Sequence, residues 1–222
     1  MTIRHHVSDA LLAEYVSGAL EESWSLAVAT HLSLCPHCRR TAAIMEASAG
    51  MLLEEADVTY EAPAEAASLA AIRERIAAKP AQAATAAASA SKTGHDRLPE
   101  PLRSYLGCDL DDLKWKALGV GAFQIRIPTA DKAIEARLLR IPAGKAVPEH
   151  GHGGRELTLV LRGAFRDGDL HFGPGDLEEA GDELEHQPVA EPGEDCICLA
   201  ITDAPLRFHS RVMRFIQPWI GI

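Results

Sequence analysis

The sequence predicts an α+β protein with two domains, a small all-α domain followed by an antiparallel β-barrel. Three observations support this prediction. Apolar residues recur at helical spacing up to about residue 80, and a tract of small residues rich in alanine follows. After Leu98, short apolar runs alternate with Gly and Pro turns. We therefore expect a helical domain over residues 1–80, a flexible linker over 81–97 and a β domain over 98–222.

Four helices are expected in the first domain. Ser8 is a suitable N-cap for the first helix, which uses apolar positions from Leu11 onward. The second should cover about residues 24–34, with Trp24 anchoring either the helical packing or the partner surface. The third should begin at Pro36, which fits a first helical turn, and continue to about residue 53. A fourth fits about residues 64–78.

The linker and the β domain differ sharply in composition. Residues 80–94 contain no large apolar side chain, so they have little to bury. The acidic run over 176–185 is most simply a solvated loop. The apolar runs expected to form strands are residues 136–141, 157–161, 164–165, 195–201 and 206–208.

Charge and cysteine content exclude several classes of protein. The formal net charge is -10, which argues against direct DNA binding, because a DNA-binding surface needs clustered Lys and Arg. No run of 18 apolar residues and no signal-type stretch occurs, so we expect a cytoplasmic protein with no membrane contact. The five cysteines should then be reduced, and clustered cysteines indicate metal or redox sites.

A zinc site is predicted in the helical domain. His31, Cys35 and Cys38 are spaced so that a helix end and the next helix start can bring them together. Zinc needs a fourth ligand, for which His6 is preferred over His5 or His37. The alternative is a redox dithiol without metal. Because a module of this size has little core of its own, the metal should contribute folding free energy.

A second metal site is predicted in the β domain. The spacing Gly144-x5-His150-x-His152-x3-Glu156-x6-Gly163 matches the first cupin motif at every position. On strands, residues two apart share a face, so His150, His152 and Glu156 can all point inward. This donor set suits zinc or another divalent transition metal. The second cupin motif is degraded, and its natural third imidazole is His186, with His171 and His209 as alternatives.

Several stretches carry a resemblance to a known family. They are residues 2–12, 28–35, 156–161, 195–200 and 202–208, together with the His-x3-Cys-x2-Cys spacing and the attached cupin motif. The chain resembles the ChrR-type anti-sigma factors. By matching position, the resemblance implies zinc on His6, His31, Cys35 and Cys38, and it supports His186 in the barrel.

The resemblance also implies a function. In that family, the helical domain wraps an extracytoplasmic-function-type sigma factor, one-to-one, and blocks its access to RNA polymerase until oxidative stress such as singlet oxygen releases it. This would make the chain a negative regulator of transcription and not an enzyme. The alternative is a metal-dependent, dioxygenase-like cupin enzyme with a helical regulatory cap. Cys196 and Cys198 should share one strand face, either as core residues or as an oxidisable pair.

Overall fold

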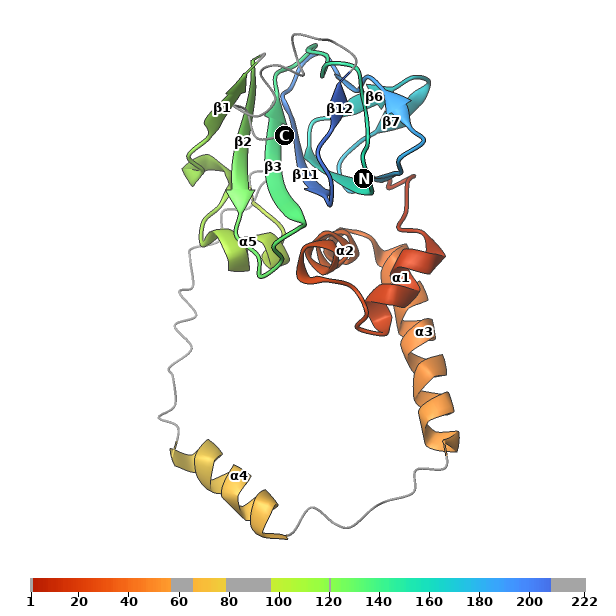
Figure 1. Cartoon of the computed structure of the whole chain (residues 1–222), viewed down its shortest axis with the longest axis vertical. Coiled ribbons are helices and arrows are strands. Elements are labelled where there is room, and N and C mark those ends of the chain that lie inside the picture. Colours follow the sequence, from red (N-terminus) through yellow and green to blue (C-terminus); the bar gives the residue numbers. More distant parts are fainter. Residues whose placement is uncertain (1, 57–65, 79–96, 120, 209–222) are drawn as a thin grey trace.

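The computed structural model describes residues 2–56, 66–78, 97–119 and 121–208, and all structural statements below refer to them. Figure 1 shows helices gathered below a group of β strands, with α3 reaching away from them and α4 standing apart. The predicted fold class, an all-α part followed by an antiparallel β part, is confirmed. The predicted linker falls outside the described residues except for Arg97.

All four predicted helices are present near their expected positions. They are α1 (Asp9–Val16), α2 (Glu22–Leu34), α3 (Pro36–Glu55) and α4 (Ala66–Ala78). The Ser8 side chain accepts a hydrogen bond from the backbone N–H of Leu11, as expected of an N-cap. Two further short helices, α5 (Glu100–Leu106) and η1 (Leu110–Asp112), precede the strands and were not predicted. No described helix combines the length and apolarity needed to cross a bilayer.

The β part consists of three antiparallel sheets rather than one continuous ladder of the described strands. The large sheet has the order β1 (Lys116–Gly119), β2 (Ala122–Ile127), β3 (Glu135–Ile141), β11 (Cys196–Thr202), β5 (Glu156–Arg162) and β8 (Leu177–Ala180). One small sheet pairs β10 (Val189–Ala190), β6 (Phe165–Asp167) and β7 (Leu170–Phe172). The other pairs β12 (Arg207–Phe208), β4 (His150–Gly151) and β9 (Glu185–His186).

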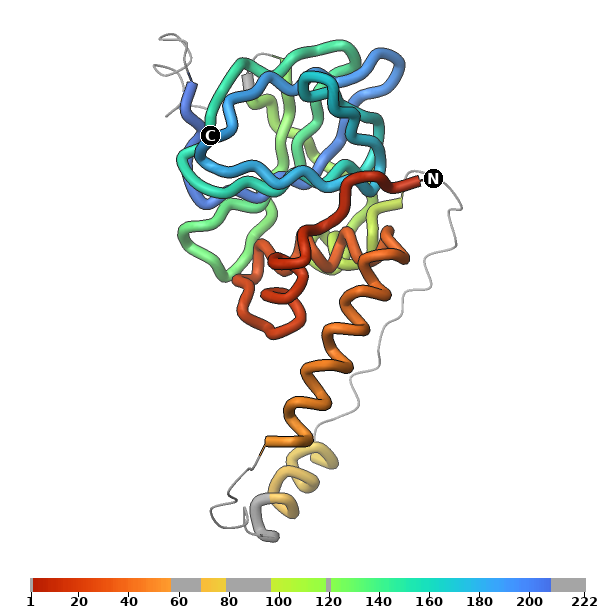
Figure 2. Tube along the Cα trace, turned by 90° about the vertical axis from the view of Figure 1, so that its right-hand side faces the viewer, coloured from red at the N-terminus to blue at the C-terminus, as the bar shows by residue number. Residues whose placement is uncertain are grey.

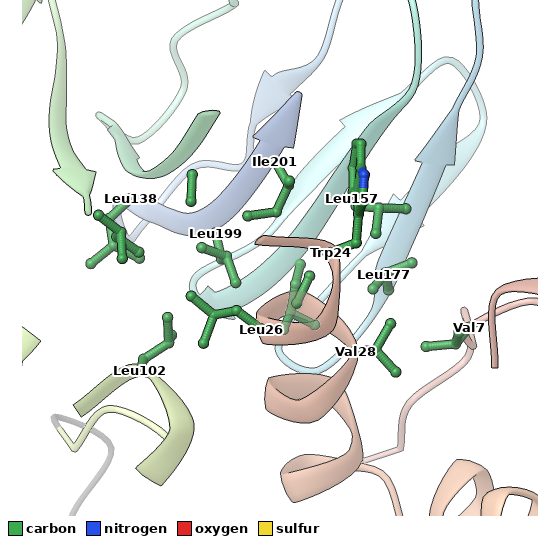
Figure 3. Close-up of a cluster of buried hydrophobic side chains, with 14 of the residues drawn as sticks. Val7, Trp24, Leu26, Val28, Leu102, Leu138, Leu157, Leu177, Leu199 and Ile201 are labelled. Carbon is green, nitrogen blue, oxygen red and sulfur yellow. The ribbon is translucent and has the colours of Figure 1, made fainter. Parts of the chain in front are cut away.

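The two faces of the large sheet have different chemistry. On its outer face, a row of four leucines runs across strands β3, β11, β5 and β8, and α2 packs against β11 and β5. Figure 3 shows Trp24, Leu26 and Val28 of α2 over these strands. The leucines of this row are Leu138, Leu199, Leu159 and Leu177, all fully or almost fully buried. The helical and β parts therefore share one hydrophobic core.

Hydrogen bonds align the first turn of α2 on the β part. The Glu22 carboxylate accepts bonds from the Tyr105 hydroxyl at 2.7 Å and from the backbone N–H of Ala130 at 2.6 Å. The backbone N–H of Ser23 donates to Asp131 at 2.7 Å. Because apolar burial and polar bonds both act here, α2 is fixed to the sheet in position and direction.

One sequence prediction is wrong in this region. The acidic run over 176–185 is not wholly a solvated loop, because Leu177–Ala180 forms strand β8 and two of its acidic residues are buried. Asp176 is only 3% exposed and Glu178 only 8% exposed. The charge of the run predicted that these side chains are exposed to solvent. Both carboxyl groups are instead buried, because residues from other segments lie next to them.

Candidate metal centres

The first cluster of metal-binding side chains forms where α2 ends and α3 begins. Cys35 has an extended backbone that ends α2, and Pro36 starts α3, so His31 and Cys38 face each other across the turn. His31 Nε2 lies 3.2 Å from Cys38 Sγ. His6 Nδ1, from the segment before α1, lies 3.4 Å from Cys35 Sγ and 3.5 Å from Cys38 Sγ. The structure thus brings all four predicted ligands together.

These separations fit a tetrahedral ion. Zinc bonds of about 2.0 Å to nitrogen and 2.3 Å to sulfur separate tetrahedral ligands by about 3.3–3.8 Å. Two of the nitrogen–sulfur separations, 3.4 and 3.5 Å, lie within this range, and the third, 3.2 Å, lies just below it. Burial lowers the pKa of His31 to about 4, an effect that the Gly175 backbone only partly offsets, so its imidazole is neutral at pH 7, as a metal ligand must be.

The Cys38 thiol of this cluster is a poor nucleophile without a metal. Burial and the neighbouring Cys35 raise the pKa of Cys38 to about 11. A divalent cation reverses this effect, because it binds the thiolate directly. The donor set therefore fits a zinc ion better than a reactive dithiol.

The two alternative histidines lie outside this cluster. The ring of His37 is 4.7 Å from that of His6 but is not among the four converging side chains. His5 points the other way, where its Nε2 lies 3.1 Å from the carbonyl oxygen of His171 and its ring packs on Phe172.

The segment that carries His6 is bonded directly to the β part. We call residues 3–8 the N-terminal strap, which Figure 2 shows crossing from the β sheets to α1. Asp176 Oδ1 accepts from the backbone N–H groups of Arg4 at 2.6 Å and His5 at 2.9 Å. Ser8 donates its backbone N–H to Glu179 at 2.7 Å. His6 is therefore held in place from both sides by residues next to or on β8.

The second cluster lies between the two small strands β4 and β9. His150 and His186 are direct cross-strand partners, and His152 follows two residues later. His186 Nε2 lies 3.2 Å from His150 Nε2 and 3.0 Å from His152 Nε2. All three side chains are buried.

Hydrogen bonds assign the protons of two of these imidazoles. His150 Nδ1 lies 2.8 Å from the carbonyl oxygen of Pro148, which only accepts, so Nδ1 carries the proton. His186 Nδ1 lies 3.0 Å from an Asp167 carboxylate oxygen, with the same consequence. Both Nε2 atoms then present lone pairs to one point, which is unfavourable unless a cation lies there. The geometry fits a metal ion.

Glu156 lies beside this group of three histidines rather than within it. Its Oε2 is 3.4 Å from His152 Nδ1, and its Oε1 accepts from the Thr158 hydroxyl at 2.9 Å. Contacts with His152 and His150 lower its pKa despite burial, so it is a carboxylate. Of the alternatives, His171 lies 3.4 Å from Glu191, and His209 lies outside the described residues.

Two acidic residues near this cluster were missed from sequence. Asp167 and Glu178 share the Nδ1 side of His186, at 3.0 Å and 4.0 Å. Burial and the charge of Asp167 raise the pKa of Glu178 to about 8, so its carboxyl is mostly protonated at neutral pH. Glu178 lies between the apolar residues Leu177 and Ala180 on a possible strand, which indicated that it could be buried. The negative charge of the run concealed this indication.

The inner face of the large sheet borders a cavity of about 650 Å³ beside the second cluster. His150, Glu156 and Glu178 line it at the metal side. Cys196 and Cys198 also line it, as expected for strand residues two apart. Hydrogen bonding to Cys196 and burial raise the pKa of Cys198, which disfavours a reactive thiolate.

Known proteins share the sequence and the fold of this chain. The family described as the ChrR cupin-like domain matches residues 104–204. The anti-sigma-E factor ChrR of Cereibacter sphaeroides is 52% identical over 222 residues, covering 100% of both chains. The crystal structure of Rhodobacter sphaeroides SigE in complex with the anti-sigma ChrR is similar with a TM-score of 0.74 and 49% identity. That match covers 91% of this chain and 100% of the other.

Proposed function

Because this chain belongs to the family of ChrR anti-sigma factors, we propose that it binds an extracytoplasmic-function-type sigma factor one-to-one and blocks its access to RNA polymerase. Proteins of this family are regulators, so the chain is not an enzyme. It is a negative regulator of transcription that makes no direct contact with DNA. Since its partner serves RNA polymerase, it acts in the cytoplasm and away from the membrane.

The observation that carries this proposal is the apolar surface of α3 and α4. Leu52 and Leu53 are 71% and 72% exposed near the end of α3. On α4, Leu69, Ile72 and Ile76 are all about half exposed or more. Contiguous exposed apolar side chains on helices are typical of partner-binding surfaces. A sigma factor held between α3 and α4 would bury them.

A zinc ion in the first cluster would help to position the apolar surface of α3. We propose that His6, His31, Cys35 and Cys38 hold one zinc ion, which would cross-link the strap, α2 and α3. The cross-link fixes the start of α3 and hence the direction in which its apolar side chains project. Residues 1–80 are the proposed helical domain, with 81–97 as linker and 98–222 as the cupin-like domain.

In the cupin-like domain we propose a second metal on His150, His152, Glu156 and His186, either zinc or another divalent transition metal. His150, His152 and His186 converge on one point. Glu156, whose Oε2 lies 3.4 Å from His152 Nδ1 at their edge, would move in as the fourth donor. The sensing role belongs to this domain: oxidative stress such as singlet oxygen modifies it, and the sigma factor is released.

Two sets of contacts support the transmission of a structural change from the cupin-like domain to the helical domain. Strand β8 carries Glu178 toward His186 on one face, while neighbouring Asp176 and Glu179 hold the strap around His6. The outer face of β11 and β5 packs on α2. A shift of these strands would therefore displace both His6 and α2. This displacement would change how the helical domain binds the sigma factor.

Co-purification tests the proposal. The full chain, expressed with the candidate sigma factor, should elute as a one-to-one complex with zinc in the first cluster. Leu53→Asp should weaken the complex at least about tenfold, because a charge replaces a buried leucine at the interface. Glu54→Gln, an exposed neighbour, is the matched control. Failure of the full chain to bind any sigma factor would refute the function.

A further inference from the structure

One buried nitrogen atom of the first metal cluster has no partner. His31 is fully buried, and within the described part of the chain its Nδ1 is one of two buried side-chain nitrogen or oxygen atoms without a hydrogen bond. The other ring nitrogen, Nε2, faces Cys38 Sγ at 3.2 Å. A buried polar atom without a partner is costly, so folded proteins rarely keep one unless it serves a purpose.

The backbone of Gly175, in the turn before β8, acts on this histidine. It raises the pKa of His31 against the larger, opposing effect of burial. An acceptor has this effect, because it stabilises the protonated ring, whereas an N–H donor would oppose protonation. The N–H of Gly175 already donates to the Val160 carbonyl oxygen at 2.8 Å. The group that acts on His31 is therefore the Gly175 carbonyl.

The lack of a side chain at residue 175 allows this close approach. Gly175 has a φ of +89°, in the left-handed region that favours glycine. A Cβ atom there would lie 2.6 Å from Ile3 Cδ1 and 3.8 Å from Leu34 Cβ. Ile3 belongs to the strap that carries His6, and Leu34 lies about one helical turn after His31 on α2. Gly175 therefore lies where both histidine-bearing segments meet the cupin-like domain.

The turn that contains Gly175 is fixed to the cupin-like domain. Besides accepting from Gly175, Val160 of β5 donates its own N–H to the Asp176 carbonyl oxygen at 3.0 Å. The next residue, Leu177, donates its N–H to the His5 carbonyl oxygen at 3.2 Å. Residues 175–177 thus hold the strap while they are themselves held by β5.

We propose that the Gly175 carbonyl of the cupin-like domain accepts a hydrogen bond from His31 Nδ1 when the first cluster holds its metal ion, and that it thereby positions this ligand. The inference rests on the zinc site proposed above and deepens it. A histidine that binds a metal through Nε2 carries its proton on Nδ1, and an acceptor there fixes the orientation of the ring and raises its basicity.

The same carbonyl disfavours the other tautomer of the ring. With the proton on Nε2, the Nδ1 lone pair would face the carbonyl oxygen, which is also an acceptor. The turn therefore favours the tautomer that binds metal. It follows that the zinc affinity of the helical domain depends on a backbone group of the cupin-like domain.

NMR of the full zinc-loaded chain tests the hydrogen bond, with isotope labels on the histidine nitrogens and the glycine carbonyl carbons. We expect His31 to carry its proton on Nδ1, and this nitrogen to couple to the Gly175 carbonyl carbon. Gly175→Ala should weaken zinc binding about 10–100-fold in chelator competition, followed at the His6 and His31 ring resonances. Gly193→Ala is the matched control, because Gly193 also has a positive φ, +107°, but a Cβ there would meet nothing within 4 Å.

Three results would overturn the proposal. A His31 proton on Nε2 in the zinc-loaded chain, or an Nδ1–H that does not couple to Gly175, would remove the hydrogen bond. Equal zinc affinity of Gly175→Ala and Gly193→Ala would remove the positioning role while leaving the zinc site in place. Ring resonances of His6 and His31 that do not respond to zinc would remove the zinc site itself. If Gly175→Ala fails to fold, the NMR measurement on the parent chain still decides.

Discussion

Replacing Asp176 by alanine should loosen the N-terminal strap and with it the first metal cluster. Asp176 is 3% exposed, and its two oxygens accept three backbone N–H bonds, from Arg4, His5 and Gly173, at 2.6, 2.9 and 2.8 Å. A hydrogen bond to a buried carboxylate contributes about 1.5–3 kcal/mol net. Each strap bond contributes less, about 1–1.5 kcal/mol, because the donors are on exposed Arg4 and half-buried His5. Their loss lowers the free energy of strap opening by about 2–3 kcal/mol.

The measurable consequence is faster opening of the strap. A change of about 2–3 kcal/mol raises the open population by about 30- to 150-fold, since each 1.4 kcal/mol is tenfold. Hydrogen exchange of a peptide covering residues 2–8 should accelerate accordingly, and a chelator should remove the metal that His6 helps to hold more quickly. Asp182→Ala, an exposed acid nearby, should change neither rate. Unchanged exchange in residues 2–8 with Asp176→Ala would refute the reasoning.

Other perturbations have equally definite outcomes. Cys38→Ser should reduce the zinc content by one equivalent in metal analysis. It should also lower the free energy of unfolding, because the free energy of zinc binding at the first cluster contributes to folding. Asp167→Asn should weaken barrel metal affinity about 10–100-fold in chelator competition, since Asp167 orients His186; unchanged affinity would exclude that role. Metal-free Glu178→Gln should gain stability over the metal-free parent as pH rises from 4.5 toward 8, by up to about 5 kcal/mol in denaturant titration. The cause is the raised pKa of about 8 of this buried acid, which makes the folded parent retain a proton that the unfolded chain releases; a pH-independent difference would contradict it.

Local signals in the sequence were enough for the helices and for much of the sheet. Ser8 and Pro36 marked helix starts, and the structure has helices beginning at Asp9 and Pro36. Apolar runs at 136–141 and 195–201 became β3 and β11. The strands β1 and β2 were missed because they are short and partly exposed, so their apolar pattern is weak.

Met51 shows the limit of periodicity as a predictor of burial. Its near-helical spacing from Met45 favours a core position, yet Met51 is 64% exposed on α3. Periodicity shows that a helix has an apolar side, but not whether that side faces the protein's own core or a partner. Trp24, with the same kind of pattern, is 4% exposed because α2 packs on the sheet.

The sequence by itself determined the candidate ligands, because metal chemistry restricts donors to few residue types at restricted spacing. His31, Cys35, Cys38, His150 and His152 were readable in this way. Only the tertiary structure decided how the parts connect. The strap bonds to Asp176, the leucine row under α2, the half-buried Asp167 and the buried Glu178 all depend on residues from other segments of the chain. Their burial depends on partners that no local pattern specifies, which is why charge alone assigned the acidic run around β8 to solvent.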